Sequence, residues 1–202
     1  YDLKTKEFSS VQSETSLIND WINCLHYSSD NKLYVGTYDG VNCIDINSSD
    51  FQSYKILPQN VIYSIYEDTS GIIWIGSSEG LSSWNKETKK ITTYTTTNGL
   101  PSNTIYAIEG DDDFLWISTN AGISQFQKNN NKFINYYVGD GLQGNEFYKN
   151  ASFKDSQGTI WFGGMNGITY FNPQDIINPA KKWNIRITDF FLHNSPVRKG
   201  MK

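Results

Sequence analysis

A segment of ten residues recurs four times along the chain. The copies read KLYVGTYDGV, IIWIGSSEGL, FLWISTNAGI and TIWFGGMNGI, at residues 32–41, 72–81, 114–123 and 159–168. Each copy closes on a glycine (Gly40, Gly80, Gly122, Gly167), and an aromatic residue stands six positions earlier (Tyr34, Trp74, Trp116, Trp161). The glycines follow one another at spacings of 40, 42 and 45 residues. A repeat of this length indicates one supersecondary unit stacked on copies of itself, so it constrains the fold more than any other feature.

Each unit divides into four short runs of strand-forming residues. The first strand, a, is predicted at 22–27, 61–67, 104–110 and 150–155, and strand b is the repeated segment itself. Strand c is predicted at 41–46, 81–86, 123–128 and 168–172, and strand d at 51–56, 91–96 and 133–138. Turns that open on Asp and close on Gly, such as residues 68–71 and 155–158, join strands a and b.

These units predict an all-β fold made of β-propeller blades. Helical periodicity is nearly absent, and the aromatic content of 15% favours strands. Four strands in a repeat of about 42 residues, joined by short turns, are typical of a four-stranded antiparallel blade. We expect a partial propeller of about four blades.

The alignment of the repeats also predicts the boundaries. Residues 1–11 align with the end of a blade and supply its strand d at 7–11. The predicted blades span 12–57, 58–98, 99–139 and 140–179, the last without its own strand d, and residues 184–202 read as the first strand of a truncated β-sandwich domain. Because the chain opens on Tyr1 and inside a blade, we expect a piece of a longer protein.

The linkers between blades repeat as well, as GLPSNTIY (99–106) and GLQGNEFY (141–148), with LPQNVIY (57–63) as a shorter relative. We expect the Leu to fill the space between blades. The recurring Asn (Asn60, Asn103, Asn145) is expected to hydrogen-bond to the backbone as the chain enters the next blade.

Composition excludes several classes of function. The formal net charge of -4 leaves no basic surface for nucleic acid, and no apolar run approaches the roughly 18 residues of a membrane span. The two histidines, His26 and His193, lie in different units without a nucleophile pattern beside them. We therefore predict no catalytic residue and no cofactor.

Acidic residues invite a metal or acid–base interpretation. Residues 109–113 cluster carboxylates, but they fall on an a–b turn, where a solvated acidic turn explains them. Glu67, Asp68, Glu109 and Asp111 could be imagined as a glycosidase pair, yet Asp68 and Asp111 hold equivalent positions in the repeat. Repetition of the fold explains them, and no metal site is predicted.

The two cysteines, Cys24 and Cys43, fall on strands a and c of one blade with strand b between them. Strands two apart lie about 9.6 Å from each other, whereas a disulfide needs Cα atoms within about 7 Å. We predict two free, mostly buried thiols.

With these motifs in hand, the chain resembles a known family. Units of the form D-x-x-G-x-I-W-[IF]-G-x-x-x-G-[LI], joined by G-L-x-x-N-x-[IF]-Y, are similar to two-component-regulator propeller repeats. NGITYFNPQDI (166–176) followed by IRITDFFLHNSPV (185–197) resembles the junction to the immunoglobulin-like triple-tyrosine domain of the same proteins. The pattern departs from the family at Tyr34, where Trp is usual, and at Ser118, where Gly is usual.

The resemblance implies a function that the residues alone do not. Such repeats are typical of the periplasmic sensor region of Bacteroidetes hybrid two-component systems, which recognises a glycan or oligosaccharide and passes the signal to a histidine kinase. A non-catalytic periplasmic sensor fragment is therefore expected. A protein-interaction or dimerisation propeller is the alternative, and a glycan-hydrolase propeller is the least favoured one.

We expect a ligand to bind the loops whose sequences differ between the copies of the repeat. In propellers the b–c and d–a connections emerge on one face, and sugars are held by aromatic faces beside planar polar groups. The candidate ligand-binding residues are Tyr38, Asp39, Glu79, Asn120, Asn166, Asn145, Glu146 and Tyr148.

The predicted partners are an oligosaccharide and a second copy of the chain. The strand at 7–11 is the missing partner of the fourth blade, so two chains that exchange it would form a strand-swapped homodimer with eight blades. Closure within one chain would instead give a four-bladed ring. The family that the chain resembles builds propellers of about seven blades, and the curvature of such blades disfavours so tight a ring.

Overall fold

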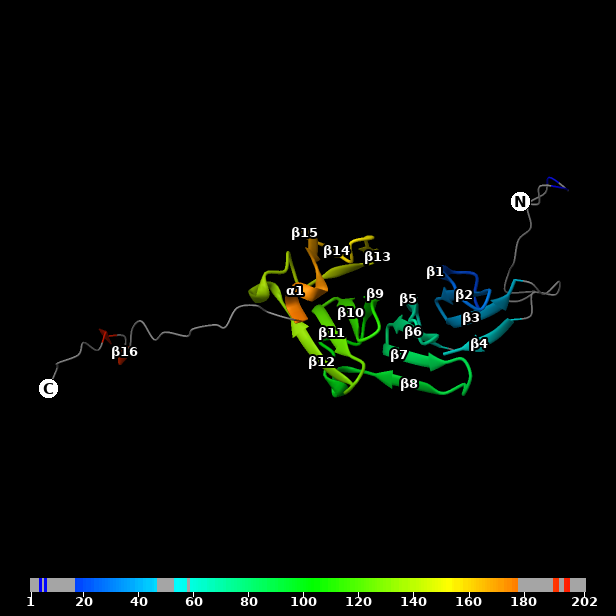
Figure 1. The fold of residues 1–202 in the computed structure, drawn as a ribbon, viewed down its shortest axis with the longest axis horizontal. Coiled ribbons are helices and arrows are strands. Elements are labelled where there is room, and N and C mark those ends of the chain that lie inside the picture. The colour runs from blue at the N-terminus through cyan, green and yellow to red at the C-terminus, as the bar shows by residue number, and fades with distance from the viewer. Residues whose placement is uncertain are drawn as a thin grey trace. The chain divides into compact units, whose positions relative to one another are not determined.

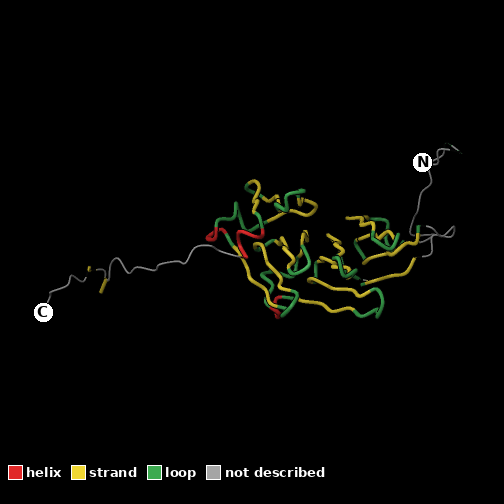
Figure 2. Tube along the Cα trace, viewed as in Figure 1, coloured by secondary structure: helices red, strands yellow, loops and turns green. Residues whose placement is uncertain are grey.

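The fold is described from a computed structural model, which describes residues 4, 6, 17–46, 53–57, 59–177, 191–192 and 195–196. The chain divides into two compact units, Tyr1–Phe171 and Asn172–Lys202. Strands dominate the first unit (Figure 2). Figure 1 shows its sheets following one another in chain order.

The first unit contains three four-stranded antiparallel sheets and one three-stranded sheet, each with its strands paired in chain order. The first blade is β1 (Ile22–Tyr27), β2 (Lys32–Thr37), β3 (Gly40–Asp45) and β4 (Ser53–Ile56), and the second is β5 (Ile62–Glu67), β6 (Ile72–Ser77), β7 (Gly80–Asn85) and β8 (Ile91–Tyr94). The third is β9 (Ile105–Gly110), β10 (Phe114–Thr119), β11 (Gly122–Gln127) and β12 (Lys132–Tyr136), and the fourth is β13 (Phe147–Lys154), β14 (Ile160–Gly164) and β15 (Gly167–Phe171). The prediction of an all-β partial propeller of four blades is confirmed.

The repeated glycines form the turns between strands b and c. Gly40, Gly80, Gly122 and Gly167 all have positive φ, between 116° and 131°. This backbone conformation is accessible to glycine without steric cost, which explains why the repeat keeps a glycine there.

The repeated aromatic residues pack the blades onto one another. The ring of Trp74 meets Phe126 of the third blade at 5.4 Å between centroids, and Trp116 meets Phe171 of the fourth at 4.6 Å. Tyr34 meets Trp84 of the second blade at 5.8 Å. The aromatic of strand b in one blade thus covers the strand c residue of the next, as the repeat predicted.

Linker residues complete this packing. Leu100 is buried in the cluster that joins the second and third blades, together with Ile105, Leu115 and Phe126. The expectation that the linker Leu fills the space between blades is met at this junction. Full burial of such a side chain contributes about 1.5–3 kcal/mol.

The inner strand of the fourth blade begins earlier than the sequence predicted. β13 starts at Phe147, whereas a strand was expected only from residue 150. Phe147 pairs with Gly164, and the next regular pair joins Ser152 to Phe162, so the residues between them form a wide bulge. Asn150 has a left-handed φ of 58° within that bulge. The bulge hides the alternation by which a strand is recognised.

Short helices in the linkers were not predicted. The outer strands end at Tyr94 and Tyr136, and the 3₁₀ helices η1 (Thr96–Asn98) and η2 (Val138–Asp140) follow them. In η1 the Thr95 backbone N–H donates to Asn98 Oδ1, and Thr97 N–H donates to the Thr95 hydroxyl. These side-chain bonds offer the backbone a turn in place of further strand.

The two thiols are free, as predicted. Cys43 is buried, whereas Cys24 is half-buried. Burial raises the pKa of the Cys24 thiol to about 12, although a hydrogen bond with the Gly36 backbone opposes the rise. The two residues lie on β1 and β3, on either side of β2.

The second unit contains α1 (Pro173–Ile177), where no helix was expected, and a hairpin of β16 (Phe191–Leu192) and β17 (Ser195–Pro196). The side chain of Asn172 accepts the Gln174 N–H just before the helix. The predicted strand at 7–11 lies outside the described residues, as does most of the predicted sandwich strand at 184–202. Among the described residues, no helix has the length and hydropathy of a membrane span.

Candidate ligand-binding face

The b–c turns and the d–a linkers lie at the same end of the blades. The start of each inner strand pairs with the end of strand b; Ile62, for example, pairs with Ser77. We call this end the loop face. It comprises the turns 38–39, 78–79, 120–121 and 165–166, the linkers 57, 59–61, 95–104 and 137–146, and the first residues of strands a.

A hydroxyl at the end of strand b holds the first three turns of the loop face. Thr37 Oγ1 donates to the carbonyl of Gly40 at 2.9 Å and accepts the Asp39 N–H at 3.0 Å. Ser77 and Thr119 make the same pair of bonds in the next two blades. The hydroxyl at the end of strand b therefore fixes the backbone of each turn, and the residues at the tip of the turn can differ in sequence from blade to blade.

The fourth blade has Gly164 in place of the hydroxyl residue. There the side chain of Gln143 lies beside the turn, and its Oε1 accepts the Asn166 N–H at 2.9 Å. Gln143 Nε2 is buried without a hydrogen-bond partner. The fourth turn is thus held by a linker side chain and carries an unsatisfied amide beneath it.

The predicted site residues all fall on the loop face. Glu79, Asn120, Glu146 and Asn166 are exposed, and Asp39 is half-buried. Tyr38 and Tyr148 are 41% and 52% exposed. The Tyr148 hydroxyl donates to the sulfur of Met165 at 2.9 Å, which ties the inner strand of the fourth blade to its own b–c turn.

Asn145 has the structural role expected of the repeated Asn. Its Oδ1 accepts the Val138 N–H at 2.9 Å, and Asn103 accepts the Thr96 N–H at 2.8 Å in the preceding linker. The carbonyl of Asn145 also accepts the N–H of Gly122 at 2.6 Å. The side-chain oxygen of Asn145 is thus already engaged, which leaves its amide nitrogen for a ligand.

The structure adds residues that the sequence analysis did not propose. The inner strands have a register irregularity at the same position, where Asn23, Tyr63 and Tyr106 are skipped by the pairing, and Tyr148 opens the wider bulge of β13. A β-bulge re-aims the side chain of the extra residue. The repeated pairs Ile62-Tyr63, Ile105-Tyr106 and Phe147-Tyr148 were the signal available in the sequence.

The bulged residues lie close to one another and to the first b–c turn. The rings of Tyr63 and Tyr106 meet edge to face at 5.5 Å, and those of Trp21 and Tyr38 at 5.4 Å. Lys149 Nζ lies 5.9 Å from the centre of the Tyr38 ring. We call these five residues the tyrosine cluster.

The pKa of Tyr63 shows that the cluster is electrostatically connected. Burial raises it, the neighbouring Tyr106 and Tyr38 raise it further, and the positive charge of Lys149 opposes the rise. The fourth blade also reaches the first here, since Asn150 Nδ2 donates to the carbonyl of Asn23 at 3.3 Å. Residues from all four blades therefore converge on one place.

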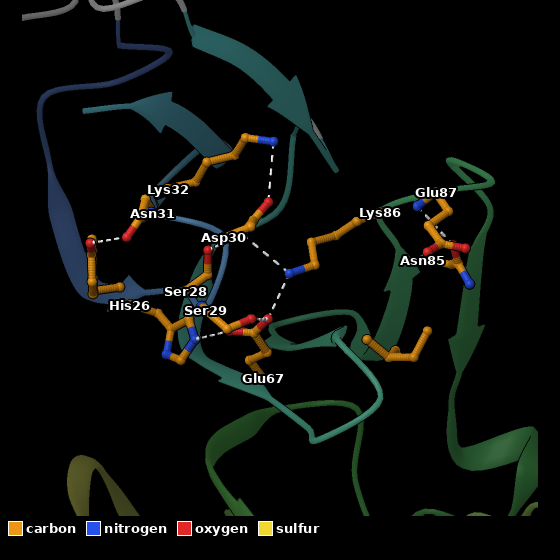
Figure 3. Close-up of polar contacts among 12 residues, drawn as sticks. His26, Ser28, Ser29, Asp30, Asn31, Lys32, Glu67, Asn85, Lys86 and Glu87 are labelled. Carbon is orange, nitrogen blue, oxygen red and sulfur yellow. Dashed lines mark hydrogen bonds and ion pairs between the residues drawn. The ribbon is translucent and has the colours of Figure 1, made fainter. Parts of the chain in front are cut away.

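The opposite end of the blades, which carries the a–b turns, is built differently. Figure 3 shows Lys86 of the second blade between Glu67 and Asp30. Lys86 Nζ lies 2.6 Å from Glu67 Oε1 and 3.2 Å from Asp30 Oδ1, and Ser29 donates both its N–H and its hydroxyl to Glu67. His26 Nε2 lies 3.5 Å from the same carboxylate. These contacts join the first blade to the second.

The next two junctions repeat this arrangement. Lys128 Nζ of the third blade lies 3.0 Å from Asp68 Oδ2 of the second and donates to the carbonyl of Asp111 at 2.8 Å. Lys154 of the fourth blade donates to the carbonyl of Gly110 at 2.6 Å. The a–b turns therefore form a polar seam between blades.

Glu67 and Asp68, two of the carboxylates considered for acid–base chemistry, belong to this seam. Burial by itself raises the pKa of Glu67, but hydrogen bonds from Lys86 and Ser29 outweigh it and hold the pKa below its ordinary range. The pKa of Asp68 is lowered in the same way, against burial, by Trp74 and Lys128. Asp111 accepts the N–H groups of Asp113 and Phe114, as the equivalent turn position predicts. No group of three or more metal-ligating side chains is found among the described residues.

Comparison with known proteins supports the resemblance seen in the repeat. Residues 56–79, which run from the end of β4 through β5 and β6, match the two component regulator propeller family. The histidine kinase P4 of Formosa agariphila is 26% identical over 141 residues, which cover 70% of this chain and 7% of that protein. The chain thus spans a small part of the length of this relative.

Solved structures share the fold. The extracellular domain of a hybrid two-component system of B. thetaiotaomicron matches with a TM-score of 0.77 and 24% identity, over 96% of this chain and 28% of that one. The corresponding domain of a second such system matches at 0.71 and 23%, over 84% and 24%. Virginiamycin B lyase of Staphylococcus aureus matches at 0.55 and 20%, over 75% and 55%. At these identities the likeness is one of fold.

Proposed function

We propose that this chain, whose second blade is a two-component regulator propeller repeat, is part of a periplasmic sensor of a hybrid two-component system. It recognises a glycan or oligosaccharide on its loop face and passes the signal toward a histidine kinase. Similarity to a histidine kinase and to extracellular domains of two-component systems supports the sensor role. The exposed aromatic side chains of the loop face carry the assignment of the binding surface.

Sugar recognition fits the chemistry of this face. Pyranose rings present apolar C–H faces that pack on aromatic rings, while their hydroxyls require planar polar partners. Tyr38 and Tyr148 offer the aromatic faces, and Glu79, Asn120 and Asn166 are exposed nearby in the same set of turns. The packed blades hold these loops in fixed positions. Ligand binding would therefore be transmitted as a rigid-body movement of blades.

The proposed role is non-catalytic. A binding function needs the exposed aromatics and amides of the loop face, whereas the acidic residues at the other end hold blades together. The likeness to virginiamycin B lyase lies below the identity at which it would say more than fold.

Titration calorimetry with a panel of plant and host oligosaccharides tests this proposal. We expect at least one to bind, and Tyr148→Ala to weaken that binding about tenfold or more, since loss of one aromatic contact of 1.4 kcal/mol is a factor of ten. Tyr27→Ala is the matched control, because Tyr27 is a tyrosine of similar exposure, 58%, at the a–b end of β1 and thus outside the loop face. Absence of binding to every sugar contradicts the proposal.

A second candidate function, self-association, is favoured by the two ends of the first unit. The outer side of the first blade has an apolar cavity of about 380 Å³, lined by Leu17, Ile22, Leu25, Leu33, Val35, Ile44 and Ile46. On the fourth blade, Phe153, Ile168 and Tyr170 are exposed and Trp161 is only half-buried. These are the sides that blades cover elsewhere in the chain, because Trp74 and Trp116 are buried by the blade that follows.

We propose that a second copy covers these sides, with Trp161 of one copy packed against the exposed Leu25 of the other. Exchange of residues 7–11 between copies, in a strand-swapped homodimer, belongs to the same proposal. Sedimentation equilibrium tests it: we expect a dimer that Leu25→Asp dissociates, with Ile134→Asp, an exposed residue of β12, as the control. A monomer at all concentrations rules this association out.

A further inference from the structure

Lys149 stands out among the charges of the loop face. The b–c turns and d–a linkers contain no lysine or arginine, and their charged residues are the carboxylates of Asp39, Glu79, Asp140 and Glu146. Lys149 comes from the bulge of β13, beside Tyr148. A cation is therefore brought to this acidic face by the one inner strand whose bulge is several residues long.

The ammonium group of Lys149 is not used to hold the fold together. Lys32, Lys86 and Lys128 each lie within 3.2 Å of a carboxylate oxygen, and Lys154 donates to a carbonyl. Among the described residues, Lys149 instead lies near the ring of Tyr38, with Nζ 5.9 Å from the ring centre. A cation over an aromatic face keeps its N–H donors available for a further acceptor.

The position of Lys149 is set from both sides. Next to it, Asn150 adopts a left-handed backbone conformation. Its side-chain amide donates to the carbonyl of Asn23, which joins β13 of the fourth blade to β1 of the first. On the other side, Tyr148 bonds to Met165. The bulge is therefore anchored at both ends, and Lys149 reaches into the tyrosine cluster from an anchored backbone.

The surroundings of Lys149 are aromatic. Its charge acts on Tyr63, whose ring packs against Tyr106, and Trp21 lies edge-on to Tyr38 with 70% of its surface exposed. A charge beside partly buried rings is less screened than one in open water, so its attraction for an anion is stronger. Exposed aromatic faces beside an ammonium that has no ion pair among the described residues are the complement of a sugar ring that bears an anionic group.

We propose that the tyrosine cluster binds an acidic sugar, with Lys149 contacting its carboxylate or sulfate group and the ring of Trp21 or Tyr38 packing on the pyranose. This inference rests on the proposed function, since it names the class of oligosaccharide that the same face takes. The exposed carboxylates at the rim of the face disfavour other anions, so selectivity requires a ligand that places its charge at Lys149.

Matched pairs of acidic and neutral sugars test the inference. Trigalacturonate and trimannuronate are each compared with their methyl esters, and a sulfated galactan disaccharide with its desulfated form, by calorimetry at low and high salt. We expect an acidic form to bind about tenfold or more tightly than its neutral partner, since hydrogen bonds to charged groups exceed the 1.4 kcal/mol that equals one factor of ten. Salt should weaken the acidic form and leave the neutral one unchanged.

Three variants assign the effect to one side chain. Lys149→Met should abolish the preference for the acidic form, Lys149→Arg should retain it, and Lys90→Met, which removes an exposed lysine from the opposite end of the second blade, should leave it intact. Acidic and neutral forms that bind alike, or a preference that survives Lys149→Met, overturn the inference. Binding of neutral sugars only overturns it while leaving the proposed function standing, whereas no binding by any sugar overturns both.

Discussion

At the a–b turns, lysines end on partners in the neighbouring blade: Lys86 on Glu67 and Asp30, and Lys128 on Asp68. On the loop face, Lys149 instead lies over an aromatic ring. The two ends of the same blades thus use the same residue types differently. At one end, lysines and carboxylates pair with each other and stabilise the fold, whereas at the other Lys149 and Glu79 have no ion pair among the described residues. Function is therefore sought at the end whose charges and aromatics the fold does not use.

The largest effect is expected from Asp68→Ala at the a–b end. The Asp68 carboxylate accepts Trp74 Nε1–H at 2.8 Å, Lys128 Nζ and two backbone N–H groups. Its removal leaves a buried indole N–H without an acceptor and takes the carboxylate from the half-buried Lys128 ammonium, which keeps its bond to the Asp111 carbonyl, so the expected cost is about 3 kcal/mol of unfolding free energy. Urea unfolding followed by tryptophan fluorescence measures this loss.

Asp155→Ala is the matched control for that variant. Asp155 accepts the N–H groups of Gln157, Thr159 and the Trp161 indole in the same turn geometry, but no lysine pairs with it among the described residues. We expect a clearly smaller loss of stability. Equal losses in the two variants would show that the turn, and not the seam between blades, is what Asp68 stabilises.

Acid should weaken the seam. Burial by itself raises the pKa of Asp30. Hydrogen bonds from Ser28, Lys32 and Lys86 outweigh this effect and lower the pKa to about 2 from the ordinary value of 3.8. A lowered pKa means that the carboxylate stabilises the fold above pH 4 and that this contribution is lost as the pH falls toward 2. Thermal unfolding from pH 7 to pH 2 should show this decline.

Lys86→Met sharpens the pH experiment. Without the ammonium, the pKa of Asp30 returns toward its ordinary value, so the decline in Tm between pH 4 and pH 2 should become shallower. The pKa of Lys86 is raised by Glu67 and Asp30 against the effect of burial, so its own contribution persists through neutral pH and is lost only in strong base. Parallel pH profiles of the variant and the parent would argue against the seam.

The inner strand β1, which carries Cys24, should be rigid in the folded chain. Cys24 lies on β1, and burial raises its pKa to about 12, so little thiolate is present at pH 8. We expect iodoacetamide to modify Cys24 slowly in the folded chain and much faster in urea, as read by mass spectrometry of the digested protein. Fast modification without urea would place β1 among the mobile parts of the molecule.

The smallest effect is expected at the tips of the loop face. Glu79→Gln changes an exposed side chain with no ion pair among the described residues, so the free energy of unfolding should change by no more than about 0.5 kcal/mol. Glu67→Gln makes the same chemical change in the seam and should cost distinctly more, because Lys86 and Ser29 lose a charged acceptor. Similar costs at both positions would remove the difference between the two ends.

Much of the fold was readable from the repeat. The six-residue offset from Trp74 to Gly80, kept in every copy, predicted both the packing aromatic and the turn glycine, because each serves a local geometry that must recur in every blade. The linker Asn was readable for the same reason. The start of β13 was not, since its bulge breaks the alternation of side chains on which a strand prediction depends.

The candidate site was only half readable. Tyr38 was found because it stands in a turn that differs between copies, and Tyr148 because it lies in the linker ahead of the strand predicted at 150–155. Tyr63 and Tyr106 were passed over because, within a strand, a tyrosine reads as packing. Only the pairing register shows that both residues are skipped and that their rings meet each other.

The sequence by itself determined the blades, because a period of about 42 residues with fixed aromatic and glycine positions admits few other architectures. Tertiary structure alone decided which side chains converge. Lys149 and Tyr38 are more than one hundred positions apart in the chain. They meet because the inner strands of the four blades converge, which brings the start of β13 next to the first blade. Contacts of that kind depend on the curvature of the sheets and the position of a bulge, which leave no local pattern in the sequence.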